Sequence, residues 1–185
     1  MIQKLKRNIS LRAYLMYKEK EIDVEFELLF PYIDKDILLI SYPDYINHIL
    51  SIYNTEKTDK DLLVWDRVTN SYIALTQLVP PTARGKNSAA REKNATPLHI
   101  DENKTQPKLI AVGPNKLAID QYFLKIDKHL ILLPTKDIIK AIDYLFKAHY
   151  VFHTEYNGDL KNFWTLIQHY FYKISSNCSN KVIEY

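Results

Sequence analysis

Hydrophobic and polar positions alternate most regularly between residues 22 and 28 of the 185-residue chain. Four apolar residues there are separated by Asp23, Glu25 and Glu27, which is the period of a strand with one buried face. Pro43, followed by apolar residues at helical spacing, predicts a helix. Other runs of strand-forming residues lie at 11–17, 37–40, 62–65 and 72–78. The order of these elements predicts a ubiquitin-like, β-grasp module over residues 1–79.

The C-terminal part has a different pattern, with short apolar runs first and long helical stripes afterwards. Runs at 109–112, 122–126 and 130–133 predict strands, the last two as a hairpin. Thr135 and Asp159 are candidate N-caps of two helices, and Asn157 with Gly158 forms the break between them. The apolar stripes are Ile138, Ile139, Ile142, Leu145, Phe146 and His149, then Leu160, Phe163, Trp164, Ile167, Phe171 and Ile174. These stripes predict a small α+β module over residues 109–185 that ends in an antiparallel helical hairpin.

Residues 80–108 separate the two modules and share the pattern of neither. This segment holds four of the eight prolines and no aromatic residue. It contains too little apolar surface to offset the entropy of ordering it, so we predict a disordered polar linker. The whole chain is therefore expected to be an α+β protein with a flexible linker.

Composition excludes several classes of protein. The single cysteine, Cys178, rules out an intramolecular disulfide and a cysteine-rich zinc module. No stretch approaches the roughly 18 apolar residues of a membrane span, and no apolar run follows the basic N-terminus as in a signal peptide. We therefore expect an intracellular protein, cytoplasmic or nuclear, without membrane contact.

No group of residues predicts a catalytic, cofactor or metal site. His149 and His153 have the spacing that lets two imidazoles face one metal, but a third ligand is missing, and His149 continues an apolar stripe. The three glycines lie apart from one another, which excludes a glycine-rich phosphate loop. The sequence thus predicts a protein that is not an enzyme and that uses no cofactor.

Two binding hypotheses remain. In the first, Asp23, Glu25 and Glu27 line one face of a strand and attract a basic protein partner. The leading function is then a non-catalytic protein–protein interaction module. In the alternative, the protein associates with nucleic acid through cations of the linker, because lysine and arginine neutralise phosphates. These cations are Arg84, Lys86, Arg91 and Lys93.

Two family resemblances accompany these patterns. Tyr42-Pro43-Asp44-Tyr45 before a predicted helix and Leu63-Val64-Trp65-Asp66 before a predicted hairpin resemble PB1-type ubiquitin-like domains, which implies protein binding. The series Phe146-Lys147-Ala148-His149-Tyr150-Val151-Phe152, Tyr156, Leu160 and Phe163-Trp164 is similar to the C-terminal end of uncharacterised animal proteins associated with mobile elements. The second resemblance spans residues 107–174 and implies a mobile-element origin without assigning an activity.

Overall fold

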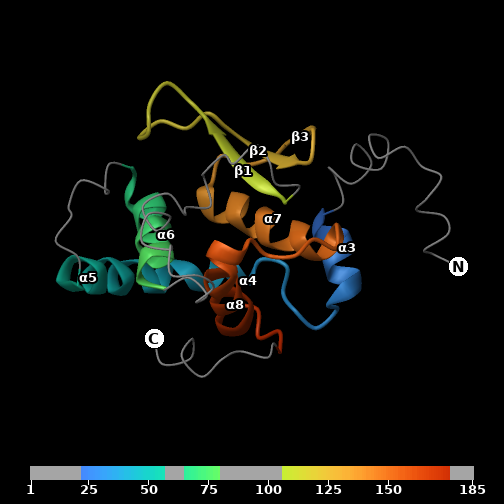
Figure 1. Ribbon diagram of the computed structural model, residues 1–185, viewed down its shortest axis with the longest axis horizontal. Helices are drawn as coiled ribbons and strands as arrows, with labels where there is room; N and C mark the ends of the chain where they lie inside the picture. The colour runs from blue at the N-terminus through green and yellow to red at the C-terminus, as the bar shows by residue number, and fades with distance from the viewer. Residues whose placement is uncertain (1–21, 57–64, 80–105, 176–185) are drawn as a thin grey trace, which may run out of the picture.

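The computed structural model describes residues 22–56, 65–79 and 106–175, and it combines helices with one antiparallel sheet (Figure 1). The predicted α+β class is therefore confirmed. The N-terminal elements are α3 (Ile22–Leu29), α4 (Ile37–Ser41), the 3-10 turn η1 (Tyr42–Tyr45), α5 (Ile46–Glu56) and α6 (Arg67–Leu78). The C-terminal elements are β1 (Lys108–Val112), β2 (Gln121–Ile126), β3 (His129–Leu132), α7 (Ile138–Val151), the 3-10 turn η5 (Gly158–Leu160) and α8 (Lys161–Tyr170).

Helix α3 occupies the segment predicted as the first clear strand, so that prediction is wrong. Ile22 and Phe26, one helical turn apart, are buried together, whereas Leu28 is 74% exposed. Alternate apolar residues can therefore lie on two sides of a helix as well as on one face of a strand. The helix is favoured over the strand because it lets Ile22 and Phe26 pack against α7. The run at 37–40 is likewise helical, in α4.

Helix α6 replaces the turn and strand predicted between residues 66 and 78. Asp66 caps this helix, because its Oδ1 accepts hydrogen bonds from the backbone N–H groups of Val68 and Thr69, each at 3.0 Å. Residues 69 to 76 are all buried although four of them are polar, so polarity along this helix does not mark an exposed face that would reveal its period. The β-grasp module is not confirmed, since the described part of residues 1–79 contains helices in place of its strands.

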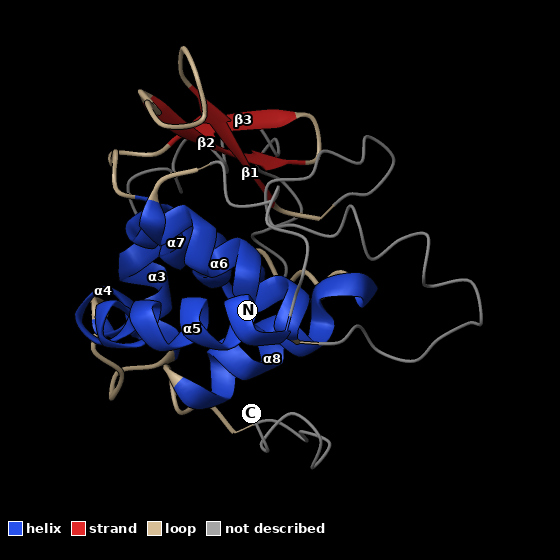
Figure 2. Cartoon of the chain, turned by 90° about the vertical axis from the view of Figure 1, so that its left-hand side faces the viewer, coloured by secondary structure: helices blue, strands red, loops and turns tan. Residues whose placement is uncertain are grey.

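The three predicted C-terminal strands are confirmed and form a sheet in the order β1-β2-β3. Both pairs are antiparallel, with Ile110 opposite Phe123 and Phe123 opposite Leu132. Strand β1 begins at Lys108, the last residue assigned to the linker, while residues 80–105 lie outside the described part of the chain. Figure 2 shows the sheet as a layer on one side of the helices.

Helix α7 lies at the centre of the structure. It contacts α3, α4 and α6 as well as strands β1 and β2, so residues from both predicted modules share one hydrophobic core. Phe26 of α3 lies edge-on to Phe146 of α7, with ring centroids 6.2 Å apart. Phe146 also stacks on Tyr172 at 4.0 Å. The two flanks of the linker therefore pack together.

The two C-terminal helices are confirmed, but their ends differ from those predicted. Asp137 caps α7 by accepting from the N–H of Ile139, while the Thr135 hydroxyl accepts from the N–H of Asp137. Asn157, in place of Asp159, caps the turn that leads into α8. The helices meet where the Trp164 ring approaches Phe146, with centroids 6.3 Å apart.

Truncation of Trp164 tests how much this aromatic contact contributes. Trp164 is 2% exposed, so Trp164→Ala should lower the free energy of unfolding by ~3–5 kcal/mol through lost burial and a residual cavity. Urea titration followed by circular dichroism measures the loss. Leu28→Ala, at an exposed position of α3, is the control and should change stability by less than ~0.5 kcal/mol. Equal losses for both variants would contradict a buried Trp164.

Candidate protein-interaction surface

The sheet has one face against the helices and one face directed away from them. Leu109, Tyr122, Leu124 and Ile131 are buried on the inner face. The side chains between them form what we call the outer face: Lys108, Ile110, Val112, Gln121, Phe123, Lys125, Leu130 and Leu132. Five of these eight side chains are apolar.

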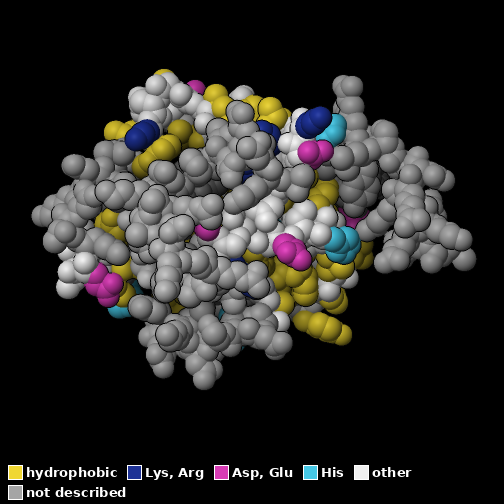
Figure 3. Space-filling model, viewed as in Figure 1, with side chains coloured by type: hydrophobic (Ala, Val, Ile, Leu, Met, Phe, Trp, Pro, Cys, Tyr) yellow, Lys and Arg dark blue, Asp and Glu magenta, His cyan; other side chains and the backbone are white. Residues whose placement is uncertain are grey.

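The apolar residues of the outer face form a continuous row across all three strands. Ile110, Phe123 and Leu132 lie opposite one another on neighbouring strands. Leu130 lies on the same face of β3, two residues before Leu132. Leu130 is 61% exposed and Leu132 43% exposed. Hydrophobic side chains are visible in Figure 3 along the upper margin, where Figure 1 places the sheet. A solvent-facing side of an antiparallel sheet is normally polar, so this row has the composition of an interface.

Positive charge gathers at the end of the sheet where β2 turns into β3. Lys125 lies directly opposite Leu130 on the outer face, and Lys128 is exposed in the turn. Neither makes an ion pair within the described ranges. Asp127, also in the turn with a φ of 53°, partly offsets this charge. The outer face thus combines an apolar row with a moderately cationic end.

The three acids predicted to bind a partner do not form one acidic face. On helix α3, Asp23 and Glu27 are one turn apart on one side, whereas Glu25 projects from another side because successive residues are rotated by about 100°. Glu27 is exposed, but the carboxylate of Asp23 is engaged with lysines of α7. The single acidic face was predicted because residues 22–28 were assigned to a strand. Since these residues form a helix, the prediction that the three acids share one face is wrong.

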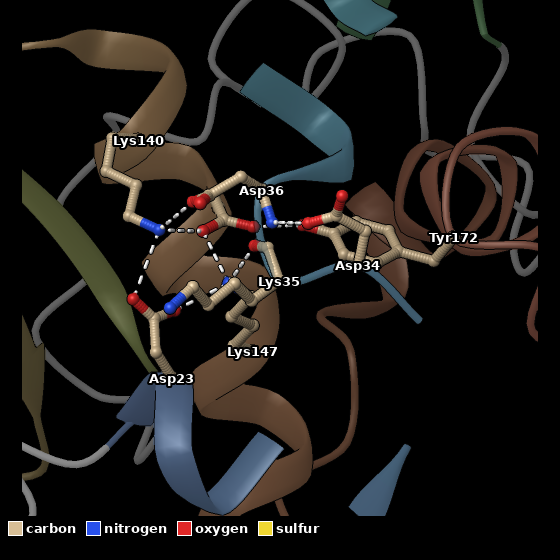
Figure 4. A network of polar contacts seen from close by, with 8 residues as sticks. Asp23, Asp34, Lys35, Asp36, Lys140, Lys147 and Tyr172 are labelled. Carbon is tan, nitrogen blue, oxygen red and sulfur yellow. Dashed lines mark hydrogen bonds and ion pairs between the residues drawn. The ribbon is translucent and has the colours of Figure 1, made fainter. Parts of the chain in front are cut away.

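Asp23 belongs to a buried charge network that joins α3 to α7 (Figure 4). The Lys147 ammonium group is fully buried and donates three hydrogen bonds. Its acceptors are Asp23 Oδ1 at 2.5 Å, the Lys35 carbonyl oxygen at 2.6 Å and Asp143 Oδ2 at 2.7 Å. Because an ammonium group has three hydrogens, Lys147 is completely satisfied inside the protein.

A second lysine completes this network. Lys140 Nζ lies 2.9 Å from Asp36 Oδ1 and 3.1 Å from both Asp23 Oδ2 and Asp143 Oδ2. Tyr172 donates to the other oxygen of Asp143. Burial favours a higher pKa for Asp23, but the hydrogen bond and charge of Lys147, with those of Lys140, outweigh it and lower the pKa.

Asp143 differs from Asp23 in its balance of burial and charge. It is fully buried, and burial raises its pKa despite the two neighbouring lysines and the Tyr172 hydroxyl. All of these polar atoms face one another, so the network fastens α3 and the α3–α4 connection onto α7. Sequence analysis missed it, although Lys140, Asp143 and Lys147 at helical spacing beside an apolar stripe were a signal.

The two spaced histidines do not converge. His149 is buried, as expected for a residue of the core edge, and its Nδ1 donates to the Leu145 carbonyl oxygen at 2.8 Å. Its ring packs beside the rings of Tyr156 and Trp164, with centroids 5.0 and 5.4 Å away. His153 lies beyond the end of α7 and is exposed. Within the described ranges, no three potential ligands gather around a metal position.

The linker cations predicted to contact nucleic acid, Arg84, Lys86, Arg91 and Lys93, lie outside the described residues. Among the helices that are described, none has the length and apolar character needed to cross a membrane. Comparison of the chain with protein-family models, with curated proteins and with solved structures gave no match.

Replacing Lys147 tests the buried network. Lys147→Met leaves Asp143 buried with one cationic partner fewer and removes the donor to the Lys35 carbonyl. We expect the free energy of unfolding to fall by ~3–5 kcal/mol, because removing one partner of a buried ion pair leaves the remaining buried charge poorly compensated. Guanidinium titration at pH 7 measures it. Lys128→Met, at an exposed lysine, is the matched control, and a loss for Lys147→Met as small as the control's would contradict the network's role.

The pH dependence of stability tests the environment of His149. Burial lowers its pKa to about 4, although the hydrogen bond to Leu145 opposes this shift. As pH falls below about 6.5, the unfolded chain binds a proton that folded His149 does not, so stability decreases until both forms are protonated near pH 4. This component amounts to at most ~3 kcal/mol.

His149→Phe should remove this component, whatever its effect on absolute stability. Urea titrations at intervals between pH 7.5 and 4 would show a shallower pH dependence for the variant. His48→Phe, at an exposed position of α5, is the control and should retain the slope of the unmodified protein. Identical slopes for His149→Phe and the unmodified protein would show that His149 is not held neutral.

Proposed function

We propose that the protein is a non-catalytic protein–protein interaction module that binds its partner through the outer face of the sheet. The observation that carries this proposal is the apolar row formed by Ile110, Phe123, Leu132 and Leu130. Association removes such side chains from water, which is the main favourable term in protein–protein binding. The inner face packs on α7, whereas Leu130 and Leu132 of the outer face are exposed and can contact a partner.

The chemistry of the outer face favours a protein over a nucleic acid. Leucine, isoleucine and valine offer no donors to base edges and no rings on which bases stack. Phe123 is the one aromatic residue of the outer face, and it is half-buried. Lys125 and Lys128 favour the alternative of a nucleic-acid-associated protein, but Asp127 offsets part of their charge. The linker cations belong to the same alternative.

A non-catalytic role is supported by where the two carboxylates with shifted pKa values lie. Asp23 and Asp143 have shifted pKa values, and both contact Lys140, whose own pKa is raised, in the buried network. Perturbed groups of this kind can also indicate catalysis, but catalytic groups must be directed at a cleft that admits substrate. An intracellular location, a PB1-type relationship and a mobile-element origin stay hypotheses alongside this proposal.

Site-directed photo-crosslinking tests the proposal. A benzophenone amino acid at position 132, in cells that express the protein, should form a covalent adduct with the partner, whereas one at position 28 should not. The partner identified in this way is then purified and titrated. Leu132→Asp should weaken its binding at least ~10-fold, because a carboxylate would be desolvated in the interface.

Leu28→Asp is the matched control, because Leu28 is also an exposed leucine but lies on α3. Thermal unfolding of both variants shows whether the fold is retained. Equal loss of binding by the two variants would contradict a role for the outer face. Binding of single-stranded DNA or RNA tighter than ~10 µM, abolished by Lys125→Glu with Lys128→Glu, would favour the nucleic-acid alternative.

A further inference from the structure

Strand β3 has a backbone edge that no described strand covers. The N–H of Leu133 donates to the carbonyl of Tyr122 at 2.9 Å, and Leu124 is opposite Ile131. In an antiparallel pair, residues that bond the neighbouring strand alternate with residues whose N–H and C=O groups point away from it. Since Leu133 and Ile131 bond toward β2, the backbone groups of Leu130 and Leu132 point to the open edge.

The same two residues supply the most exposed leucines of the sheet. Their side chains lie on the outer face and their backbone groups lie along the open edge, so one approaching strand would meet both. An unpaired edge of this kind is a template for pairing with another chain. The edge is short, because Pro134 has no N–H with which to continue the ladder.

We infer that the partner of this edge is a second copy of the chain, joined to it through an antiparallel pair of β3 strands. This inference rests on the proposed function and identifies the partner. A two-fold axis through Ile131 places Leu130 of each copy opposite Leu132 of the other. Each N–H of Leu130 and Leu132 then meets a carbonyl of the second copy, which gives four hydrogen bonds between the copies.

Symmetry is what favours a second copy over an unrelated strand. The same axis brings four exposed leucines together on the outer face, two from each copy, and joins the two apolar rows. Cross-strand apolar pairs of this kind stabilise sheets. Pairing of the strands in the described part of the chain gives a six-stranded sheet, which is a common size.

The charges near the edge are compatible with this pairing. The axis places Lys128 opposite Pro134 of the second copy, so the two Lys128 residues do not face each other. Asp127 is placed opposite Thr135 of the second copy, next to the exposed Lys136 of that copy. By symmetry, this contact between Asp127 and Lys136 occurs twice in the dimer. Pro134 ends the ladder on both sides, which limits pairing at this edge to a closed dimer. An interface this small is below the standard size and binds weakly.

Sedimentation equilibrium of the full chain tests the dimer. Between ~10 µM and ~1 mM, the mean mass should rise from 21.8 kDa toward twice that value, as expected for a weak, reversible dimer. Leu132→Asp should remain at 21.8 kDa throughout, while Leu28→Asp should behave like the unmodified protein. Both variants replace a leucine that is exposed, so folding is retained, and circular dichroism checks this.

Cysteine cross-linking tests the register. Leu130→Cys and Leu132→Cys are each prepared with Cys178→Ser, which removes the one native thiol. In the inferred register, the Cα atoms of positions 130 and 132 are about 5.5 Å apart between copies, within disulfide range. Oxidation of the mixed variants should give a covalent dimer, whereas each variant alone, or Leu28→Cys with Cys178→Ser, should give little.

The outcomes distinguish this inference from the proposed function. A mass of 21.8 kDa up to ~1 mM, or cross-linking that is equal in the single and mixed variants, overturns the β3–β3 dimer. The interaction module would still stand if position 132 cross-links to a different protein. A dimer that Leu132→Asp fails to dissociate would also overturn the inference, because the contact would then lie elsewhere.

Discussion

The burial of Lys147 and Asp143 is the constraint on which the rest of the fold depends. Two charged groups without solvent exposure are tolerated only because Asp23, Lys140, Tyr172 and a backbone carbonyl complete their hydrogen bonds. Two of these partners, Asp23 and the Lys35 carbonyl, are more than a hundred residues from Lys147 in the sequence. The network therefore requires α3 and the α3–α4 connection to lie on α7. It thereby holds the segments before and after the linker together in one packed structure.

The central position of α7 also determines which surface is left for binding. Its apolar side chains cover the inner face of the sheet as well as α3 and α4. A three-stranded sheet covered on one face leaves its other face and its edges to solvent or to a partner. On this sheet the outer face carries Ile110, Phe123, Leu130 and Leu132, and the exposure of the two leucines is the observation behind the proposed interaction.

Part of this arrangement could be predicted from local pattern. Strands at 109–112, 122–126 and 130–133 were predicted because strand-forming residues stand between clear turn residues, and α7 and α8 because their apolar stripes have helical period. Helices α3 and α6 were missed for two reasons. Alternation at 22–28 is compatible with both a strand and a helix. In α6, polar residues are buried along with apolar ones, so its capping residue Asp66 was the remaining signal.

The candidate site shows the same division. Sequence by itself determined the apolar character and strand pairing of residues 108–133, because these depend on local alternation and turns. It placed the binding residues on Asp23, Glu25 and Glu27, because charge in a sequence does not reveal which carboxylates are neutralised by distant lysines. Tertiary structure alone decided that Asp23 is internal and that Leu130 and Leu132 are external, since both depend on what α7 packs against.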